Sequence, residues 1–473
     1  MSIVIVGLAR QGCALARYFS ARGDRVIITD AQPASALQGE IDALAGLSIE
    51  YALGGHPLSL LDGCDLVCLS GGVPPETPFG QEARRRGITL SNDSRLTLQR
   101  APAPMIGITG SSGKTTTTTL VGEMLKASGL TTWVGGNIGR PLIDRLDEIQ
   151  AGDKMVLELS SFQLQLFAEP PPGSPYLGAI LNITPNHLDR HPSMAHYTAA
   201  KANIVRFQSE ADVAVLGVDD AITGSWWREG RVRIEAGEGQ GAVDFPIQAR
   251  RVGFSLVEAV PEGAFLQDEQ LVWHWAGQEQ SICHVADLKL RGRHNVANTL
   301  AACAISGAAG ATAEAMRRVA TTFAGVLHRL ELVAEIDGVR WYNDSIATAP
   351  ERMAAALNAF DEPLVLLAGG RDKHLPWAEA ADLIRRKVRH LVLFGEAAGL
   401  IAGAIGKTGV GDLQVHRCGP LEEAVSAAAR VAQAGDVVLL SPGGTSYDAY
   451  KDFEARGEHF RACVRALKKE MEA

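Results

Sequence analysis

The sequence predicts an α/β protein of three domains, each built on a largely parallel sheet. Short apolar segments alternate with amphipathic helical segments along almost all of the chain, and this alternation is typical of parallel strands covered by helices. The length of 473 residues corresponds to roughly three domains of about 150 residues each. We therefore expect domains at 1–100, 101–325 and 326–473.

The composition is that of an ordinary globular enzyme. Hydrophobic residues make up 46% of the chain and charged residues 21%, which excludes a disordered or fibrous protein. The net charge of −9 argues against a nucleic-acid binder, which would present a basic face. The seven cysteines contain no CxxC pair and suit free thiols in a reducing compartment. The sequence shows neither a signal-peptide layout nor an apolar run of about 18 residues. It thus predicts a cytoplasmic protein that does not bind membranes.

The first expected domain opens with a strand, a turn, a helix and a second strand that ends at Asp30, in IVIVGLARQGCALARYFSARGDRVIITD. This order is similar to a dinucleotide-binding unit, but the GxGxxG turn requires a glycine where this chain has Ala9. An NAD-dependent oxidoreductase is one alternative interpretation, and Ala9 counts against it. The domain closes before APAP (101–104), which predicts a stiff connector.

A glycine loop between a strand and a helix, GITGSSGKTTTTTL (107–120), opens the second domain. Backbone N–H groups and the positive end of the helix dipole would face an anion there, and Lys114 adds a charge. The strict motif GxxxxGK(S/T) requires a glycine at the position of Ile108. Despite this departure we expect phosphate binding, with the hydroxyl of Thr115 or Thr116 directed toward Mg²⁺.

Polar side chains follow two strands downstream of this loop. Glu158 ends the strand KMVLELS, and His187 follows the strand in YLGAILNIT. A buried carboxylate needs a partner, so Glu158 is either part of an ion pair or a metal ligand. His187 by itself would be a structural histidine, but together the two residues indicate a second metal position. Lys201, on the helical segment YTAAKANIV, would by itself be a solvated lysine. A polar insertion with β character is expected at about 217–285.

The third expected domain starts near VLHRLE (326–331). Its predicted strands LVLLAGG, HLVLFG and DVVLLS each end in glycine or serine, where open α/β sheets place their binding loops. The polar clusters HRLE and YNDS, and RHNVAN at the end of the second domain, lie at the edges of predicted elements. Taken singly, each would be a helix cap or a turn.

Taken together, these segments closely resemble the Mur ligase family. The family's phosphate loop is GxxGK(S/T)T, and GSSGKTT (110–116) fits it, which accounts for the departure at Ile108. Further motifs follow in the family's order: GNIG (136–139), LELSSFQL, LNITPNHLDRH, YxxAKxxI, GRHNVANxLAA, HRLE, DSxAT and SYDAYKDFEARG. The resemblance spans essentially the whole chain. It implies a Rossmann-like UDP-binding domain, a central P-loop-type ATPase domain with a mainly parallel sheet, and a Rossmann-like C-terminal domain that binds an amino acid.

Within the family, the motifs are similar to those of members that add D-glutamate to UDP-N-acetylmuramoyl-L-alanine in peptidoglycan precursor synthesis. The resemblance implies that ATP phosphorylates the alanyl carboxylate and that the amine of glutamate then displaces phosphate. Phosphorylation is needed because oxide is a poor leaving group, so the catalyst positions substrates and neutralises phosphoryl charge. It further implies two Mg²⁺ ions. We also expect a monomer with no nucleic-acid or membrane partner.

The resemblance also implies roles for individual residues. The catalytic residues would be Lys114, Glu158, His187 and Lys201, with Lys201 carbamylated. Mg²⁺ would be held by Thr115, Glu158, His187 and Lys201. ATP would contact Gly110, Ser111, Ser112, Gly113, Lys114, Thr115, Thr116, Asn295, Asn298, Arg329 and Asp344. The UDP substrate would contact Arg10, Gln11, Asp30, Ser70, Gly72 and Asn137. The amino acid would contact Thr348, Lys373, Ser446 and Phe453.

One segment departs from the family pattern. Members that use D-glutamate usually read DSKATN where this chain reads DSIATAP (344–350), so Ile346 replaces a lysine and Pro350 follows. Arg371 or Lys373 would partly replace the lost charge. D-Glutamate is the expected substrate and L-glutamate the alternative. The long N-terminal domain disfavours a folate-type acyl substrate, and two sets of metal ligands disfavour a nucleotide-gated binding or motor protein.

Overall fold

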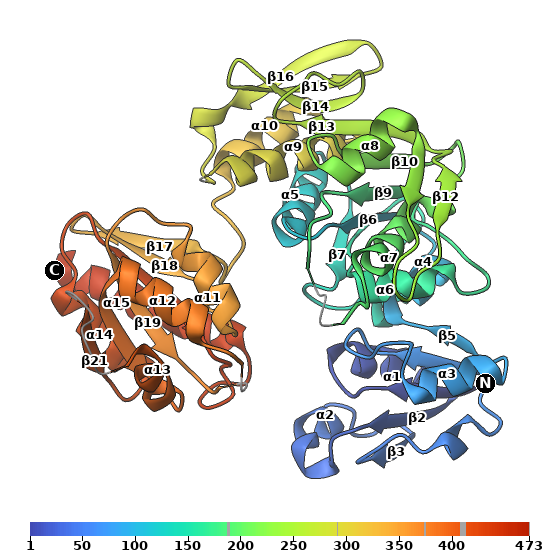
Figure 1. Cartoon of the computed structure of the whole chain (residues 1–473), viewed down its shortest axis with the longest axis horizontal. Helices are drawn as coiled ribbons and strands as arrows, with labels where there is room; N and C mark the ends of the chain where they lie inside the picture. The colour runs from blue at the N-terminus through green and yellow to red at the C-terminus, as the bar shows by residue number, and fades with distance from the viewer. Residues whose placement is uncertain (187–189, 291, 373–374, 407–412, 473) are drawn as a thin grey trace. The chain divides into compact units, whose positions relative to one another are not determined.

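The computed structural model describes residues 1–186, 190–290, 292–372, 375–406 and 413–472. The chain divides into two compact units, Met1–Phe323 and Ala324–Ala473 (Figure 1). The first unit contains two large sheets and the second contains one. All seven cysteines are free, and five of them are buried, as the apolar runs around them predicted. In the described part of the chain, no helix combines the length and the apolar character needed to cross a membrane.

The N-terminal sheet has five parallel strands in the order β3-β2-β1-β4-β5. Its strands β1 and β2 are apolar along most of their length, as expected for parallel strands covered on both faces. The strands are β1 (Ser2–Val6), β2 (Arg25–Asp30), β3 (Ile49–Leu53), β4 (Leu66–Leu69) and β5 (Thr89–Ser91). The helices are α1 (Arg10–Ser20), α2 (Gln38–Asp42), α3 (Pro78–Arg85) and α4 (Asp93–Arg100).

The central sheet has nine strands in the order β16-β15-β14-β13-β10-β9-β6-β8-β7. The strands are β6 (Met105–Thr109), β7 (Thr132–Gly136), β8 (Lys154–Glu158), β9 (Leu177–Ile180), β10 (Val213–Gly217), β13 (Arg250–Ser255), β14 (Gly263–Gln267), β15 (Gln270–Trp275) and β16 (Gln278–His284). The insertion expected at about 217–285 is therefore mostly an extension of this sheet. β13 pairs in parallel with β10, and only β11 (Arg231–Ile234) and β12 (Val243–Pro246) form a separate hairpin.

Helices cover the central sheet and carry much of its core. They are α5 (Lys114–Ala127), α6 (Ser161–Gln165), α7 (Met194–Arg206), α8 (Ala221–Glu229), α9 (Arg293–Ala308) and α10 (Ala313–Thr322). α9 buries nearly every side chain after its first turn, because it packs between α5 and the strands β13 and β14. Figure 1 shows α5, α9 and α10 close together beneath the strands β13–β16.

The register of the central strands brings three loops to one edge of the sheet. Ile108 of β6 and Gly136 of β7 both lie opposite Glu158 of β8. Since the carboxyl ends of parallel strands point the same way, the residues after β6, β7 and β8 share this edge. Gly136 has φ of 91°, and a Cβ there would lie 2.4 Å from the Glu158 carbonyl oxygen, so only glycine fits.

The second unit contains a six-stranded sheet in the order β17-β18-β22-β19-β20-β21. β17 is antiparallel to β18 and the other pairs are parallel. The strands are β17 (Glu331–Ile336), β18 (Val339–Asn343), β19 (Leu364–Gly369), β20 (Val388–Phe394), β21 (Gln414–Arg417) and β22 (Val437–Gly443). The helices are α11 (Pro350–Leu357), α12 (Ala378–Lys387), α13 (Ala398–Ile405), α14 (Leu421–Val431) and α15 (Phe453–Glu472). Because β22 lies between β18 and β19, the loops after these three strands are neighbours.

The segment that precedes β17 packs closely against the start of α15. His328 and Leu330 have left-handed φ values of 63° and 44°, which side chains other than glycine adopt only under constraint. His328 is 5% exposed and its Nδ1 lies 2.9 Å from the Asn343 side-chain nitrogen. A Cβ at Gly457 would lie 2.1 Å from the same Nδ1 atom. Only glycine therefore allows α15 to approach this imidazole.

We expect Gly457→Ala to destabilise the second unit. The added methyl group would displace a buried imidazole, an overpacking change of about 2 kcal/mol. Gly403→Ala is the matched control, because Gly403 lies in α13 with open space around its α-carbon. That control should be neutral or stabilising by about 0.5–1 kcal/mol. Urea unfolding of the full chain measures the free energy of unfolding of both variants. Equal stability of the two would contradict the close packing of Gly457 against His328.

Candidate active site

The phosphate loop connects β6 to the first turn of α5. Gly113 precedes the helix with φ of 79°, and a Cβ there would lie 2.2 Å from Asn298 Oδ1. No side chain caps the helix start, so the N–H groups of its first turn, at Lys114, Thr115 and Thr116, are placed to bind an anion. Lys114 Nζ donates to the carbonyl oxygen of Gly110 at 2.8 Å. The lysine is thus folded over the loop.

A buried carboxylate lies beside this loop. Glu158 is 2% exposed. Its Oε2 accepts from the Thr115 hydroxyl at 2.8 Å, and its Oε1 accepts from the Asn137 amide at 2.8 Å. Both donors are neutral, and burial of a carboxylate is costly without further compensation of its charge. Mg²⁺ takes one or two carboxylates and completes its shell with water and phosphate oxygens. The donor set of Thr115 and Glu158 therefore fits a magnesium ion.

Lys201 also lies beside the phosphate loop. Its side chain is 1% exposed, so the interpretation as a solvated lysine is wrong. Nζ donates to Thr109 Oγ1 at 3.1 Å and to the Gly110 carbonyl oxygen at 3.0 Å. Burial, followed by the nearby charge of Lys114, holds the pKa of Lys201 well below its usual value, against the opposing effect of Glu158. The amine is therefore readily deprotonated for a lysine.

Tyr197 is a residue of this site that sequence reasoning missed. Its hydroxyl lies 2.9 Å from Ser111 Oγ, and Lys201 Nζ lies 4.8 Å from the centre of its ring. The Ser111 hydroxyl also donates to the Thr184 carbonyl oxygen at 2.9 Å. The signal was the spacing of Tyr197 and Lys201, because residues four apart share one face of a helix.

The segment after β9 is tied to the phosphate loop. Asn182 Oδ1 accepts from the Ser112 N–H at 3.0 Å, and the Asn182 carbonyl accepts from the Ser111 N–H at 3.0 Å. The expected ligand His187 lies outside the described residues, as does Lys373. Among the described residues, no three His, Cys, Asp or Glu side chains gather as a metal cluster.

Asn298 and Asn295 connect α9 to the same loop. The Asn298 side-chain amide donates to Asn295 Oδ1 at 3.1 Å. The contact between Asn298 Oδ1 and Gly113 places this pair next to the phosphate loop. The predicted ATP residues of the first unit thus lie together, although they come from segments more than 170 residues apart in the sequence.

The predicted UDP-substrate residues line the carboxyl edge of the N-terminal sheet. Asp30, at the end of β2, accepts from the N–H of Leu8 at 2.8 Å and from that of Gln32 at 2.9 Å. Gln11 Oε1 accepts from the Gly71 N–H at 2.6 Å. Ser70 donates to the Gly7 carbonyl oxygen at 2.7 Å. These bonds hold the loops after β1 and β4 side by side.

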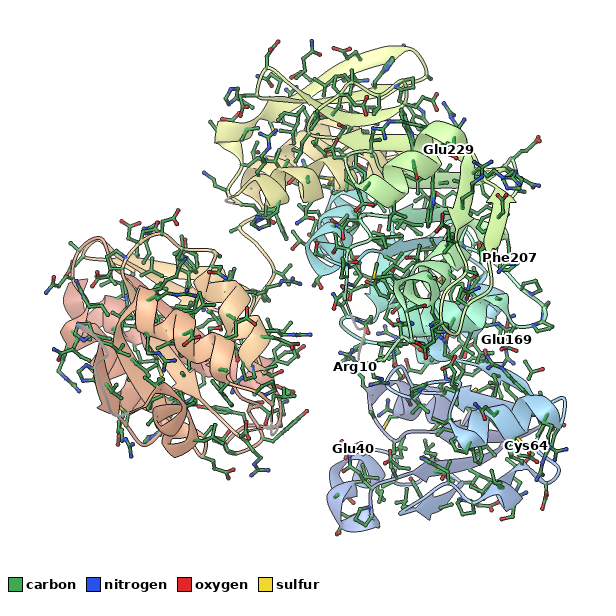
Figure 2. The ribbon with its side chains drawn as sticks, viewed as in Figure 1. Arg10, Glu40, Cys64, Glu169, Phe207 and Glu229 are labelled. Atoms are coloured by element: carbon green, nitrogen blue, oxygen red, sulfur yellow. The ribbon has the colours of Figure 1, made fainter. Side chains whose placement is uncertain are left out.

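Arg10 and Gly72 connect the N-terminal sheet to the central domain. The Arg10 guanidinium donates to the Asn137 carbonyl oxygen at 3.2 Å, and Arg190 donates to the Gly72 carbonyl oxygen at 2.6 Å. Figure 2 shows Arg10 and Glu169 near the boundary between the N-terminal domain and the central domain. Asn137 therefore contacts both the predicted UDP residue Arg10 and the predicted metal ligand Glu158.

Arg329 and Asp344 lie close together in the second unit. Arg329 stands between the left-handed residues His328 and Leu330. Asp344 is 4% exposed and accepts from the Leu330 N–H at 3.2 Å and the Ser441 hydroxyl at 2.9 Å. Burial raises the pKa of Asp344 to about 7, against the effect of these hydrogen bonds. The carboxyl group is therefore partly protonated near neutral pH.

The predicted amino-acid residues follow neighbouring strands of the second unit. Thr348 lies in the loop after β18, Ser446 lies in the loop after β22 and is 2% exposed, and Phe453 begins α15. The Ser345 hydroxyl donates to the Phe453 carbonyl oxygen at 2.7 Å. This bond joins the loop of Thr348 to the start of α15.

The segment DSIATAP (344–350), where the sequence departs from the family pattern, keeps a regular backbone. The Ile346 N–H donates to the His328 carbonyl oxygen at 3.1 Å. Pro350 occupies the first position of α11, where its missing N–H has no helical partner to lose. Arg371 donates twice to Glu396, at 2.8 and 3.0 Å. Its charge is therefore already paired, which weakens its expected role as a substitute for the missing lysine.

Family models match all three regions of the chain. The descriptions are "Mur ligase MurD-like, N-terminal domain" for residues 1–92, "Mur ligase middle domain" for 108–306 and "Mur ligase, glutamate ligase domain" for 328–444. The fold and the phosphate loop define a nucleotide-binding α/β protein. The chain belongs to the Mur ligase family, whose members are ATP-dependent ligases.

Curated relatives match almost the full length. The UDP-N-acetylmuramoylalanine–D-glutamate ligase of Symbiobacterium thermophilum is 42% identical over 98% of this chain and 97% of its own length. The ligase of the same name from Acetivibrio thermocellus is 39% identical over 98% and 96%. Among solved structures, UDP-N-acetylmuramate-alanine ligase MurC from Thermotoga maritima matches with a TM-score of 0.56 and 19% identity, over 99% of this chain and 100% of its own. That likeness concerns the fold alone.

We expect Asp344→Asn to change the pH dependence of stability. Because the folded-state pKa is raised from 3.8 to about 7, the folded chain holds a proton that the unfolded chain has lost between about pH 4 and pH 7. Wild-type stability contributed by this group therefore falls as the pH rises through that window. The free energy of unfolding of the variant, relative to wild type, should rise by about 3 kcal/mol between pH 5 and pH 8.

Urea unfolding of the full chain at the two pH values measures this change. Asp361→Asn is the matched control, because Asp361 is an exposed carboxylate of the same unit and should show no such trend. A difference between Asp344→Asn and wild type that stays constant with pH would mean that Asp344 is ionised in the folded protein throughout.

Proposed function

We propose that this protein joins D-glutamate to UDP-N-acetylmuramoyl-L-alanine with hydrolysis of ATP to ADP and phosphate, in peptidoglycan precursor synthesis. The observation that carries the proposal is the full-length similarity to D-glutamate ligases, at 42% identity for one of them. None of the relatives named above is an L-glutamate ligase, so D-glutamate is favoured over its isomer.

The reaction proceeds in two displacements. An oxygen of the alanyl carboxylate attacks the γ-phosphorus of ATP, and ADP leaves. The glutamate amine then attacks the acyl carbon of this acyl phosphate, loses a proton and expels phosphate, leaving an amide. Positioning and charge neutralisation are the main tasks of the protein in such a reaction.

The three expected domains divide these tasks. We assign the UDP substrate to residues 1–100, ATP to 101–325 and glutamate to 326–473. Lys114 and the loop N–H groups would bind the terminal phosphates, since a cation and a helix start meet there. Asn295 and Asn298 of the central domain would contact ATP, together with Arg329 and Asp344 of the third domain. Thr348, Lys373, Ser446 and Phe453 would contact glutamate.

Asp30 is the expected uracil contact in the N-terminal domain. Its carboxylate lies at the end of β2 and accepts two backbone N–H bonds. A carboxylate has more acceptor positions than these two bonds use, so it can also accept from the N–H of a base. Arg10, Gln11, Ser70, Gly72 and Asn137 would complete this site. The same arrangement lacks the second glycine of an NAD fingerprint, at Ala9.

Two magnesium sites are part of the proposal. Thr115 and Glu158 would hold one ion, and His187 with carbamylated Lys201 would hold the other, where the ions would neutralise phosphoryl charge. The buried Lys201 supports this role because an uncharged amine is the form that adds CO₂, and burial favours that form. The resulting carbamate is an anion with oxygen ligands, which suit Mg²⁺.

The remaining expectations are a cytoplasmic, monomeric enzyme without nucleic-acid or membrane partners. The net charge of −9 supports the absence of a nucleic-acid partner.

The function is tested by the incorporation of each glutamate isomer. With UDP-N-acetylmuramoyl-L-alanine and ATP, kcat/KM for D-glutamate should exceed that for L-glutamate, and phosphate release should require both the nucleotide sugar and glutamate.

Lys114→Ala should abolish ligation because the terminal phosphates lose their cation. Ile346→Lys restores the lysine of the family pattern and should shift the ratio further toward D-glutamate. A tenfold advantage for L-glutamate would overturn the assigned isomer.

Carbamylation of Lys201 is tested by chemical rescue. Lys201→Ala should lose at least about a hundredfold in kcat, or ~2.7 kcal/mol, and acetate should restore part of the activity by supplying a carboxylate in the vacated space. Lys126→Ala is the matched control, because Lys126 is an exposed lysine on α5 and should retain full activity. Full activity of Lys201→Ala would remove this residue from the mechanism.

A further inference from the structure

The motif SYDAYKDFEARG contains a charged residue that the proposed function leaves without a role. Arg456, in the first turns of α15, is 0% exposed. Arginine is almost never fully buried unless it is paired. Among the described residues, however, no carboxylate forms an ion pair with Arg456, and its hydrogen bonds go to carbonyl and hydroxyl oxygens. A buried cation of this kind is costly, so its position calls for a reason.

The guanidinium joins the loops that follow three neighbouring strands. Its Nε donates to Ser345 Oγ at 3.0 Å, and one terminal nitrogen donates to the Ser345 carbonyl oxygen at 2.9 Å. The other terminal nitrogen donates to the Gly444 carbonyl oxygen at 3.1 Å. A Cβ at Gly370 would lie 2.8 Å from that nitrogen, so the loop after β19 also packs against it.

The three loops are also joined directly to one another. Arg371 and Thr445 exchange two backbone hydrogen bonds of 2.8 Å, and the Gly443 N–H donates to the Ala347 carbonyl oxygen at 2.8 Å. Arg456 therefore lies at the centre of a connected set of loops. A planar guanidinium with fixed donor directions is well suited to such a position.

The same loops carry the proposed glutamate contacts. Thr348 lies three residues beyond Ser345, Ser446 lies two residues beyond Gly444, and Phe453 lies one helical turn before Arg456. Ser345 Oγ also donates to the Phe453 carbonyl oxygen. A substitution at Arg456 would thus displace Thr348, Ser446 and Phe453, although the side chain of Arg456 is itself fully buried.

The charge of Arg456 has a second consequence. Burial lowers the pKa of Arg456 to about 10, with Asp448 and Tyr450 acting in the opposite direction, so the side chain stays protonated at neutral pH. A charge inside a low-dielectric domain acts over a longer range than one in water. Glutamate carries two carboxylates, and position 346 in the loop next to Arg456 holds an uncharged isoleucine.

We propose that Arg456 is a positioning residue for glutamate, holding the loops of Thr348, Ser446 and Phe453 and supplying a buried positive charge behind them. This inference rests on the proposed function, because it assumes that glutamate binds to these loops. It concerns the binding of the amino acid, whereas the nucleotide sugar is assigned to the first unit.

The test compares the KM values for glutamate and the nucleotide sugar in Arg456→Lys and Arg456→Met. Lysine keeps the charge but cannot make all three bonds, whereas methionine removes both the charge and the bonds. The KM for glutamate should rise by at least about tenfold in Arg456→Met, as expected for lost hydrogen bonds of a charged group. It should rise less in Arg456→Lys. The KM for the nucleotide sugar, whose proposed contacts lie in the first unit, should stay within about twofold of wild type.

Arg95→Met is the matched control for a structural role. Arg95 is likewise buried, at 2% exposure, and donates to the carbonyl oxygens of Leu90, Glu169, Pro170 and Pro171 in the first unit. Arg95→Met should lower the thermal unfolding temperature without a selective rise in the KM for glutamate. If Arg456→Met fails to fold, Arg456→Lys carries the comparison, and guanidinium added to Arg456→Ala should lower the KM for glutamate.

The outcomes separate this inference from the proposed function. A wild-type chain that incorporates neither glutamate isomer would overturn the proposed function and the role of Arg456 with it. A wild-type chain that ligates glutamate, with Arg456 variants whose KM values for glutamate and the nucleotide sugar rise together or not at all, would overturn the role of Arg456 alone. A selective rise in the KM for glutamate, absent in Arg95→Met, supports it.

Discussion

The burial of ionisable groups among neutral hydrogen-bond partners is the constraint on which this structure depends. In the first unit, Glu158 accepts from a hydroxyl and an amide, and Lys201 is enclosed beside the backbone of Gly110. The charged form of each group is costly to bury, and for Lys201 the attraction of Glu158 offsets only part of that cost. They lie beside a loop built to bind phosphate, so ATP and Mg²⁺ would supply the missing compensation. The stability of the site and its chemistry therefore have the same physical origin.

The second unit follows the same rule with other groups. Arg456 lies at the centre of three loops with neutral acceptors, and Asp344 is held by a hydroxyl and a backbone N–H. Interior polar groups of this kind fix the positions of loops because each lost bond leaves an unsatisfied partner. A rigid set of loops is what recognition of a small dicarboxylate requires, since discrimination between isomers depends on several contacts held at once.

Several residues serve more than one of the expected sites. Asn137 contacts Glu158 through its side chain and Arg10 through its carbonyl oxygen, so it joins the predicted metal and UDP residues. Ser111 contacts both Tyr197 and Thr184. The departure at Ile346 and Pro350 is accommodated without disrupting the backbone, because proline is suited to the first position of α11. These links bring residues from distant segments of the chain into shared hydrogen-bond networks.

The sequence by itself determined the α/β class, the phosphate loop and the family, because these depend on local periodicity and on short motifs such as GSSGKTT. It did not determine that residues 250–284 extend the central sheet, nor that Lys201 is buried rather than solvated. The sequence likewise did not show that Thr115 pairs with Glu158 or that Arg456 contacts the loops. Burial and pairing of this kind depend on which segments pack together in three dimensions. That packing joins residues far apart along the chain, so only the tertiary structure decided it.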